Sequence, residues 1–196
     1  AGFLLANGAL SGDGTELAIR RKLIENDLVE AIIILPRNLF YTTDISVTLW
    51  IINKNKKART VLQNGMPKNY RDRSGEILFM DLRQMGSPFE KKYIELTAED
   101  RAKVAETYHT WQTKEWKKEY NVPEYCYSAS FEEVKDKGFS LVPSKYIEFV
   151  NRDENIDYDT KMRALQEELT DLLKQEQQST KDLLAIFKEL GYEIKV

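Results

Sequence analysis

Cysteine and histidine are almost absent from this sequence, and their scarcity removes several kinds of site. The single cysteine, Cys126, excludes an internal disulfide and any metal site built from several cysteines. A lone cysteine is also typical of proteins in a reducing cytoplasm, which is the location we expect. The single histidine, His109, lies in a predicted helix. We interpret it as a surface or packing residue, because the sequence supplies few partners for Ser-His-Asp catalysis or for zinc.

Long apolar runs and an overall excess of charge are missing too. No run approaches the roughly 18 apolar residues of a membrane span, and the start has neither the basic head nor the cleavage site of a signal peptide. A net charge of −3 gives no global indication of nucleic-acid binding. The chain starts at Ala1 rather than at a methionine and enters an apolar segment at once, so we expect it to be part of a longer protein.

Glycine is clustered once, and the cluster does not match a cofactor motif. The segment NGALSGDGTE follows an apolar run and precedes a helical pattern, which is the placement of a dinucleotide fingerprint. Gly12 and Gly14 take the first two positions of that motif. Leu17 stands at the third, where its long side chain would prevent close helix–strand packing. We therefore interpret these glycines as turn and capping residues. The carboxylates are scattered over predicted helix surfaces and indicate no acid–base pair.

Apolar runs at the start of the chain predict an α/β fold. FLLANGAL indicates a short strand with a turn at Asn7 and Gly8, and the next segment predicts a helix capped by Asp13, with Glu16 closing the box. VEAIIIL has the near-continuous hydrophobicity of a strand covered on both faces. Strand, helix and strand form a βαβ unit, normally parallel and right-handed. ISVTLWII follows too closely for a parallel crossover, so we expect it to return antiparallel to VEAIIIL.

The middle of the chain predicts one more strand, EILFMD, and two helices. Residues 53–75 are polar and basic and form a loop with room for a small hairpin. The first helix begins at Thr97 and runs to Tyr120. The second begins at Ser130 and ends at Gly138. Each has an acidic residue three positions after its cap, which is the signature of a capping box.

The final segment has the pattern of one long helix with an apolar stripe. No glycine or proline occurs between Tyr158 and Leu190. Apolar residues recur at spacings of four and three, interrupted by Glu176 and Ser179, as in the seam of a coiled coil. The stripe alone has nowhere to be buried, so we expect it to pack on a partner, on its own domain or on a second copy. Its apolar members are Leu165, Leu169, Leu172, Leu183, Ile186 and Leu190.

Two features are candidates for binding. Clustered cations in the loop over 53–75 can neutralise phosphates, and the same composition suits an ordinary solvated connection. After VEAIIIL, Pro36 leads into Phe40 and Tyr41, just beyond the carboxyl end of a predicted strand, where open α/β sheets bind ligands. A flat ring there can stack on a flat substrate or close the edge of the sheet. The loop has a single acid, Asp72, and its basic residues are Lys54, Lys56, Lys57, Arg59, Lys68, Arg71 and Arg73.

These motifs together resemble the methylation subunits of type I restriction–modification systems. LLANGALSGDGTELAIRRKLIENDLVEAIIILPRNLFYTTDISVTLWIINKNKK is similar to the C-terminal half of their catalytic domain. GEILFMDLR, LTAEDRAKVAETYHTW and SFEEVKDKGFSLVPSKYI then follow in the family's order. The resemblance covers residues 2–150. It implies the last strands of a Rossmann-like methyltransferase sheet over 1–82, a helical and irregular extension over 83–150, and an amphipathic docking helix over 151–196.

The resemblance also implies a site. In this family of adenine-specific DNA methyltransferases, S-adenosylmethionine donates a methyl group to the exocyclic amine of an adenine that is flipped out of the duplex. LPRNLFYTT is similar to the segment whose aromatic ring stacks on that base. Phe40 takes the aromatic position, and Tyr41 is the weaker candidate. Asn7 and Gly8 would line the edge of the same pocket.

The sequence departs from the family's pattern in several places. Ala6 stands where the family has proline before Asn-Gly, and Asp44 and Ser46 stand where it has glycine and proline. The family's glycine-rich cofactor loop and its Asn-Pro-Pro-Phe catalytic loop are missing from this sequence. We therefore expect no catalytic residue in this chain. We also expect that the chain alone neither binds the cofactor nor methylates.

The resemblance finally implies partners, namely DNA and the specificity and restriction subunits of the same system. Lys54, Lys56, Lys57 and Arg59 are the predicted contacts to DNA phosphates. The long helix would dock on the helical spacers of the specificity subunit, or pair with a second copy of the chain. The alternative to the enzyme is a non-catalytic interaction module that holds a specificity subunit or associates with itself.

Overall fold

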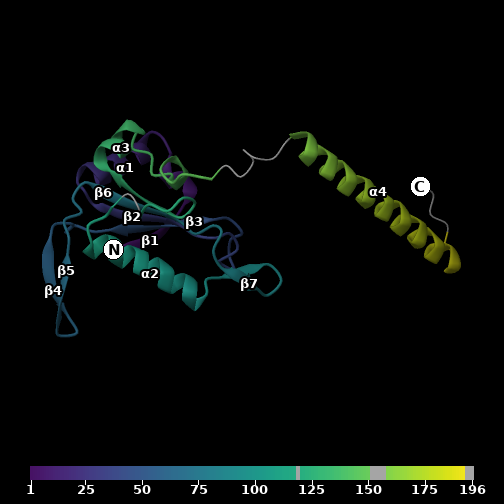
Figure 1. The fold of residues 1–196 in the computed structure, drawn as a ribbon, viewed down its shortest axis with the longest axis horizontal. Coiled ribbons are helices and arrows are strands. Elements are labelled where there is room, and N and C mark those ends of the chain that lie inside the picture. Colours follow the sequence, from purple (N-terminus) through teal and green to yellow (C-terminus); the bar gives the residue numbers. More distant parts are fainter. Residues whose placement is uncertain (118–119, 151–157, 193–196) are drawn as a thin grey trace. The chain divides into compact units, whose positions relative to one another are not determined.

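The computed structural model describes residues 1–117, 120–150 and 158–192 of the chain. The chain divides into two compact units, residues 1–150 and residues 151–196. A sheet with its covering helices makes up the first unit, and one long helix dominates the second (Figure 1). Within the described ranges, no helix combines the length and the apolar character that crossing a membrane requires.

The first unit is built on a five-stranded mixed sheet (Figure 1). In sheet order, its strands are β1 (Gly2–Ala6), β3 (Val47–Ile52), β2 (Val29–Ile34), β6 (Glu76–Asp81) and β9 (Cys126–Ser130). The central strand, β2, has β3 antiparallel on one side and β6 parallel on the other. Because β1 and β2 both run antiparallel to β3, they point in the same direction without being neighbours.

The strand directions at the start of the chain agree with the prediction from the sequence. The strand order differs, because β1 and β2 are not neighbours in the sheet. β3 returns antiparallel beside β2, as their short connection predicts. The predicted unit of strand, helix and strand is present as β1, α1 (Thr15–Glu25) and β2, with β3 inserted between the two strands. The predicted cap by Asp13 is wrong. Gly14 occupies the N-cap position with a φ of 63°, and no side chain caps the helix.

The next helix, α2 (Ala98–Thr113), begins at the predicted capping box and ends earlier than predicted. The Thr97 hydroxyl accepts a hydrogen bond from the N–H of Asp100, and the Asp100 carboxylate accepts one from the N–H of Thr97. Two amide groups of the first turn are satisfied in this way. The predicted helix continued to Tyr120, but the backbone becomes extended at Lys114.

The short helix α3 (Phe131–Asp136) has a predicted signal at each end. Ser130 and Glu133 exchange the hydrogen bonds of a capping box at its start. At its end, Gly138 takes a φ of 64°, in the left-handed region that glycine occupies at low cost. Backbone N–H groups after the helix fold back onto its last carbonyls there. The prediction that Gly138 ends this helix is confirmed.

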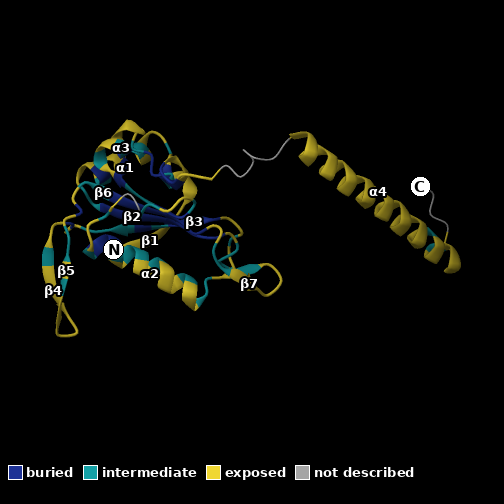
Figure 2. Cartoon of the chain, viewed as in Figure 1, coloured by how far each residue is buried: buried dark blue, intermediate teal, exposed yellow. Residues whose placement is uncertain are grey.

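Helices cover both faces of the sheet (Figure 1), and β2 is buried at every residue (Figure 2). On one face, Ile32 joins an apolar cluster with Ile24 of α1 and Val134 of α3. On the other face, Ile33 joins a cluster with Trp111 of α2. Successive residues of a strand point to opposite faces, so a strand between two helical layers needs apolar residues on both. This explains the continuous hydrophobicity of VEAIIIL.

The segment over 83–150, expected to be helical and irregular, also contributes to the sheet. β9 was not predicted, and it pairs antiparallel with β6 along five residues. The irregular segment after α3 packs back over the sheet, where the Tyr146 ring stacks on Phe79 with 4.1 Å between ring centroids. The N–H of Leu141 donates to the Leu10 carbonyl at 2.9 Å. These contacts make the segment after α3 part of the core.

Two small hairpins project from opposite ends of the first unit (Figure 1). One lies in the basic loop that follows β3, as the sequence allowed, and the other, between β6 and α2, was not predicted. Short 3₁₀ turns follow β1 and α3. These elements are β4 (Arg59–Gln63), β5 (Met66–Tyr70), β7 (Ser87–Phe89), β8 (Tyr93–Glu95), η1 (Asn7–Leu10) and η3 (Pro143–Lys145).

The second unit contains the predicted long helix, α4 (Tyr158–Glu189). It runs for 32 residues without a break, which agrees with the absence of glycine and proline from this stretch. No residue of α4 is buried (Figure 2). The helix therefore forms as the sequence predicts, with its apolar stripe exposed.

Candidate functional site

The carboxyl ends of three strands lie at one edge of the sheet. β2 and β6 are parallel neighbours, with Ile34 beside Asp81 at their ends. β1 points the same way. Its last residue, Ala6, pairs with Val47 at the start of β3, and Ile34 pairs with the adjacent Thr48. The segments that follow β1 and β2 therefore leave the sheet on either side of the start of β3. Open α/β sheets bind ligands at this edge.

The turn between β2 and β3 carries the two aromatic residues that the sequence singles out. Pro36 ends the strand pairing, since it has no N–H to donate. Asn38 takes a φ of 58°, which asparagine tolerates better than most residues. The Asn38 carbonyl accepts a hydrogen bond from the N–H of Ile94 at 3.0 Å, which ties the turn to β8. A single β-bridge between Phe40 and Thr43 narrows the turn.

Phe40 and Tyr41 lie in different surroundings. Phe40 is half-buried and packs against the apolar cluster that includes Leu35 and Met80. Tyr41 is 68% exposed, and its ring meets Tyr93 of β8 edge to face, with 4.6 Å between centroids. Neither ring is sealed inside the protein, so each keeps surface that a flat ligand can contact.

A cleft of about 300 Å³ lies beside Tyr41. The turn after β2 forms one wall, and the β7–β8 hairpin and the start of α2 form the others. The Arg101 guanidinium fixes one corner by donating to the Leu96 carbonyl. Sequence reasoning missed this cleft, because its walls come from segments about 50 residues apart in the chain, and strands of three residues give almost no periodic signal. Its aromatic lining is Tyr41, Phe89 and Tyr93.

An unpredicted ion pair occupies the same edge, at the end of β6. Asp81 is buried, and its carboxylate accepts hydrogen bonds from the backbone N–H and the guanidinium of Arg83, the shortest at 2.6 Å. The hydrogen bond to Asp81 raises the pKa of Arg83 further above its ordinary value. The Asp81 carboxylate is therefore paired with a cation two residues further along the chain.

Asn7 and Gly8, the predicted edge of the pocket, are exposed and begin the 3₁₀ turn after β1. They lie at the same edge of the sheet as the turn after β2, because β1 and β2 point the same way. The Gly8 carbonyl accepts hydrogen bonds from the N–H groups of Ser11 and Gly12. This hydrogen bonding makes the segment a fixed turn that leads into α1.

The glycines before α1 do not fit a nucleotide cofactor. A Cβ on Gly12 would stand 1.7 Å from a carboxylate oxygen of Glu16, so this carboxylate already fills the space beside the glycine. Arg20 donates to the carbonyls of Gly12 and Ala9 at 3.0 and 3.1 Å. A phosphate or a carboxylate ligand would be repelled by Glu16 at this position. The structure thus agrees with turn and capping glycines.

The predicted phosphate contacts in the basic loop do not share one environment. Lys54 and Lys57 are exposed, and Arg59 is half-buried with its guanidinium 5.1 Å from the centre of the Tyr70 ring. Lys56, in contrast, is 3% exposed. The prediction that Lys56 contacts a DNA phosphate is therefore wrong, because a lysine inside the protein cannot reach a phosphate outside it.

Lys56 instead fastens the loop to the sheet. Its ammonium donates to the Asp27 carboxylate at 2.5 Å and to the carbonyls of Val29 and Glu76 at 3.1 and 2.7 Å. All three donor positions of the ammonium are used in this way. Burial lowers the pKa of Lys56, and the hydrogen bond to Asp27 partly opposes this shift.

Two other basic residues of the loop are also held internally. Arg73 is fully buried, and its Nε lies 3.2 Å from the Glu30 carboxylate, to which the Gln112 amide also donates. Arg71 binds the Glu76 carboxylate through two hydrogen bonds of 2.8 and 2.7 Å. These pairs join the loop to β2, β6 and α2. They leave the remaining basic residues of the loop, Lys54, Lys57, Arg59 and Lys68, on the outside.

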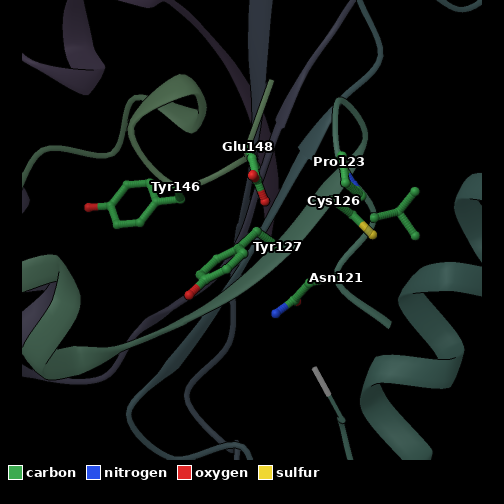
Figure 3. A pocket seen from close by; sticks show the side chains of 7 residues that line it. Asn121, Pro123, Cys126, Tyr127, Tyr146 and Glu148 are labelled. Atoms are coloured by element: carbon green, nitrogen blue, oxygen red, sulfur yellow. The ribbon is translucent and has the colours of Figure 1, made fainter. Parts of the chain in front are cut away.

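A second cavity, of about 360 Å³, lies beside β9 (Figure 3). Asn121 accepts hydrogen bonds there from an indole N–H and a backbone N–H, at 2.8 and 3.0 Å. The Tyr127 hydroxyl donates to Glu133 at 2.7 Å. Burial raises the pKa of the Cys126 thiol, which keeps this residue in its unreactive protonated form. The polar groups of this cavity therefore serve the packing of β9.

Metal-binding and histidine chemistry find no support in the described part of the chain. Among residues 1–117, 120–150 and 158–192, no three histidine, cysteine, aspartate or glutamate side chains are grouped so as to hold a metal ion. His109 is exposed on α2, with its Nδ1 3.5 Å from the Lys68 ammonium. It is a surface residue, as the sequence suggests.

The apolar stripe of α4 is exposed along the whole helix. Its six residues are each between 50% and 66% exposed. Exposed leucines at this density are uncommon on a helix that has no partner, since a surface helix normally buries one apolar face. They are Leu165, Leu169, Leu172, Leu183, Ile186 and Leu190.

Comparison with known proteins identifies the family. Residues 1–155 match the model of the N-6 DNA methylase family. The chain is 36% identical over 197 residues to the methylase subunit of the type I restriction enzyme HindI of Haemophilus influenzae. It is 30% identical over 192 residues to the MjaIX methylase subunit of Methanocaldococcus jannaschii. These alignments cover 97% and 98% of this chain but 40% and 32% of those relatives, so the chain spans less than half of their length.

Solved structures show the same fold. The methyltransferase subunit of a type I restriction-modification system from Streptococcus thermophilus superimposes with a TM-score of 0.59 and 22% identity, over 75% of this chain and 26% of that one. The M protein of the type I restriction enzyme EcoKI superimposes with a TM-score of 0.51 and 16% identity, over 98% of this chain and 41% of that one. From the family match and the sequence relatives, the chain belongs to the N-6 DNA methylase family and is related to the methylase subunits of type I restriction enzymes.

Proposed function

We propose that this chain is one part of an adenine-specific DNA methyltransferase, the methylation subunit of a type I restriction–modification system. The whole protein transfers a methyl group from S-adenosylmethionine to the exocyclic amine of adenine. The observation that carries the proposal is the turn after β2. In a member of a DNA methylase family, it presents two accessible aromatic rings at the edge where open α/β sheets bind ligands. The strand order, with β3 antiparallel between β1 and β2, supports the last strands of a Rossmann-like sheet.

Phe40 is the residue that we assign to the flipped adenine. Stacking of a base on an aromatic side chain contributes about 1–3 kcal/mol, which is comparable to the few kcal/mol that unstacking a nucleotide costs. Phe40 is half-buried against the core, so its ring is held in place before DNA arrives. Tyr41 is the second candidate, because its ring is the more exposed. Asn7 and Gly8 line the edge of the same pocket in this proposal.

The cofactor is bound by residues outside this chain in the proposal. In support, Gly12 and Gly14 are followed by Leu17 where a dinucleotide fingerprint has its third glycine. When bound, S-adenosylmethionine supplies a methyl group on a sulfonium that is a good leaving group. The contribution of this chain is a stacking surface and one wall of the base pocket. Calorimetric titration of the 196-residue chain with S-adenosylmethionine is expected to show no binding at micromolar concentrations, and a micromolar dissociation constant would contradict this assignment.

The stacking role is tested by Phe40→Ala in the full-length subunit assembled with its partner subunits. Loss of 1–3 kcal/mol of stacking corresponds to roughly 5- to 150-fold weaker binding of target DNA. Phe40→Leu keeps the apolar packing without the flat ring and is expected to share most of the loss. Phe149→Ala, which removes an aromatic ring that is 47% exposed in the segment after η3, serves as the matched control. Tyr41→Ala measured in parallel decides between the two rings.

A second measurement separates stacking from general damage. A target adenine opposite a mismatched base is easier to unstack, so Phe40→Ala is expected to weaken binding most for the well-paired target. Equal losses on paired and mismatched targets would assign Phe40 to the core instead. Unchanged affinity and turnover would remove it from the site.

We also propose that α4 docks on helices of the specificity subunit. The exposed stripe of α4 with its spacing of four and three supports this second role. Replacing Leu169 and Leu183 by glutamate places two charges in the stripe. Thr170→Glu with Gln177→Glu adds the same charges elsewhere on the helix. The proposal expects the first pair, but not the second, to abolish co-purification of the specificity subunit. Undiminished co-purification after deletion of residues 158–196 would overturn it.

A further inference from the structure

The β4–β5 hairpin forms a stiff two-stranded ribbon. Arg59 pairs with Tyr70 and Gln63 with Met66, in continuous antiparallel register. The two residues between the strands, Asn64 and Gly65, have φ values of 52° and 77°. Two consecutive positive φ angles define the tight turn whose twist matches that of the flanking strands. The ribbon therefore has one defined conformation from root to tip.

The root of this ribbon is anchored in the protein, and its tip is not covered. At the root, the N–H of Arg71 donates to the Gln112 carbonyl of α2 at 3.0 Å, and the N–H of Arg73 donates to the Lys56 carbonyl at 2.9 Å. Every residue from 60 to 67 is exposed (Figure 2). The ribbon stands out from the body of the unit as an arm (Figure 1).

The basic loop that carries this arm is strongly positive. Residues 53–75 contain seven basic residues and one acidic residue, Asp72, whereas the whole chain has 29 basic and 32 acidic residues. Three of the seven, Lys56, Arg71 and Arg73, are paired internally with carboxylates. The other four, Lys54, Lys57, Arg59 and Lys68, give the arm a positive field on a protein that is negative as a whole.

Two of these cations are held in place by an aromatic ring. Arg59, Lys68 and Tyr70 share one face of the ribbon, because residues paired in the register point to the same side. The Arg59 guanidinium and the Lys68 ammonium lie 5.1 and 5.3 Å from the centre of the Tyr70 ring. Contacts of this kind orient cations without neutralising them.

The tip is apolar, which an ordinary solvated loop would not require. Leu62 and Met66 are 74% and 70% exposed, on either side of the turn. Exposed apolar side chains at the end of a basic ribbon match the architecture of proteins that insert apolar residues into a DNA groove and bind the phosphates beside it. β-Ribbons enter either the major or the minor groove in DNA-binding proteins.

We propose that the β4–β5 hairpin is a DNA-binding arm. It enters a groove of duplex DNA with Leu62 and Met66, and Lys54, Lys57, Arg59 and Lys68 bind the phosphates on its flanks. The inference rests on the proposed function, in that duplex DNA is the polyanion on which the protein acts. It goes beyond that function in assigning a second contact, separate from the pocket for the flipped base.

The topology separates this arm from the base pocket. β3 starts beside the carboxyl end of β2, where the turn after β2 lies. It runs to the other end of the strands, where the basic loop with the arm begins. Six residues of strand span roughly 20 Å. In this proposal the arm therefore contacts duplex that flanks the target, away from the pocket of the flipped base.

The cationic part is tested with Lys57→Gln/Lys68→Gln in the 196-residue chain, by fluorescence anisotropy on a labelled non-target duplex across a salt series. Each lost phosphate contact lowers the slope of log K against log salt by about 0.9, so the double variant should lose about 1.8. The matched control is Lys22→Gln/Lys145→Gln, which removes the same charge at exposed positions on α1 and η3. A slope equal to that of the control, or equal binding of single strands and duplex, overturns the proposal.

The tip is tested with Leu62→Ser/Met66→Ser on a duplex labelled at both ends. Apolar side chains inserted between base steps kink the duplex, so the proposal expects this variant to show a smaller change of end-to-end energy transfer on binding. It also expects several-fold weaker affinity and the salt slope of the wild type. Wild-type affinity and energy transfer overturn the groove contact. The groove contact is also overturned if this variant no longer binds a partner protein but still binds the duplex like the wild type.

A final assay distinguishes failure of the arm from failure of the proposed function. The full-length protein with its partner subunits is assayed for methylation with wild-type and Lys57→Gln/Lys68→Gln arms. A higher KM for DNA with the variant supports the arm. Unchanged KM and kcat overturn the arm and leave the methyltransferase assignment intact. An inactive wild-type assembly contradicts the proposed function, while the duplex-binding slopes still decide on the arm.

Discussion

The two strands β1 and β2 have similar composition and opposite burial. GFLLA and VEAIII are both short and mostly apolar, they belong to one sheet, and they point in the same direction. Every residue of β2 is buried, and every residue of β1 is exposed. β2 lies between two strands and two helical layers. In the described structure β1 pairs on one side with β3, and its main aromatic contact is the stacking of Phe3 on Trp50 at 6.1 Å.

The comparison shows that a strand's burial is a property of its neighbours. β1 has the side chains of an interior strand, with Phe3, Leu4 and Leu5 all apolar and 37–46% exposed. A strand of this composition at the margin of a sheet is normally paired, covered or charged. In the described structure, β1 pairs only with β3 and carries no charge, so its outer side has none of these protections.

The largest expected effect concerns the buried ion pair between Glu30 of β2 and Arg73. Glu30 is 1% exposed, and Arg73 is its buried partner. Arg73→Ala leaves the Glu30 carboxylate buried without a cation, which should cost about 3–5 kcal/mol of unfolding free energy. Urea unfolding of the 196-residue chain measures it. Glu30→Leu/Arg73→Met removes both charges and should recover much of the loss. A cost below about 1 kcal/mol for Arg73→Ala would show that the pair is not buried in solution.

The next effect compares matched truncations in the two strands. Ile32→Ala in β2 removes a side chain with no exposed surface and should cost about 2–5 kcal/mol. Leu4→Ala in β1 removes one that is already 46% exposed, and we expect less than about 1 kcal/mol. The midpoints of urea unfolding compare the two losses of stability directly, because both variants replace a branched aliphatic side chain of the same size by alanine. Equal losses would mean that β1 is buried in the isolated chain.

A smaller effect follows from the bare edge of β1. An uncovered apolar strand is a template for pairing with another chain, so the 196-residue chain should associate in a concentration-dependent way. Leu4→Lys places a charge on that strand and should shift the sedimentation profile toward the monomer. Leu169→Lys on α4 is the matched control for the other exposed apolar surface. If the control alone gives monomer, self-association runs through α4 instead.

Local signals were read correctly from the sequence wherever neighbouring residues determine the structure. The capping pairs at Thr97 and Ser130 and the uninterrupted helix over residues 158–189 are examples. Each depends on contacts within a few residues. Asp13 failed as a cap because Gly14, with its left-handed φ, already occupies the position before the helix. Glycine and aspartate both suit a helix start, and the pattern alone does not rank them.

Features that depend on distant segments could not be read from the sequence. Lys56 carries the same signal as Lys54 and Lys57 in a polar, basic loop, yet Asp27 and two carbonyls enclose it. The aromatic cleft joins Tyr41 to Tyr93, 52 positions along the chain. The strand pattern placed Phe40 and Tyr41 just beyond the carboxyl end of β2, but it gave no indication of the hairpin that forms the other wall. Burial and clefts are therefore the parts that required the structure.

The smallest expected effect concerns β9, the outermost strand on the side of the sheet away from β1. Unlike β1, this edge strand is partly covered, and its Tyr127 hydroxyl donates to the Glu133 carboxylate at 2.7 Å. This hydrogen bond, with some burial, raises the pKa of Tyr127 to about 12. Tyrosine in the unfolded chain loses its proton near pH 10. Between about pH 10 and 12 the folded state therefore holds the proton more tightly, and the stabilisation present below pH 10 is lost as the pH rises through this window.

Tyr127→Phe removes the donor and should cost about 1 kcal/mol of unfolding free energy at pH 8. Because it also removes the titrating group, its unfolding free energy should fall less steeply between pH 10 and 12 than that of the wild type. Urea unfolding at pH 8 and at pH 11 measures both quantities, with the exposed Tyr41→Phe as the control. The difference between Tyr127→Phe and the wild type should narrow at pH 11. A difference that stays constant across this range would mean that Glu133 does not hold the Tyr127 proton in the folded chain.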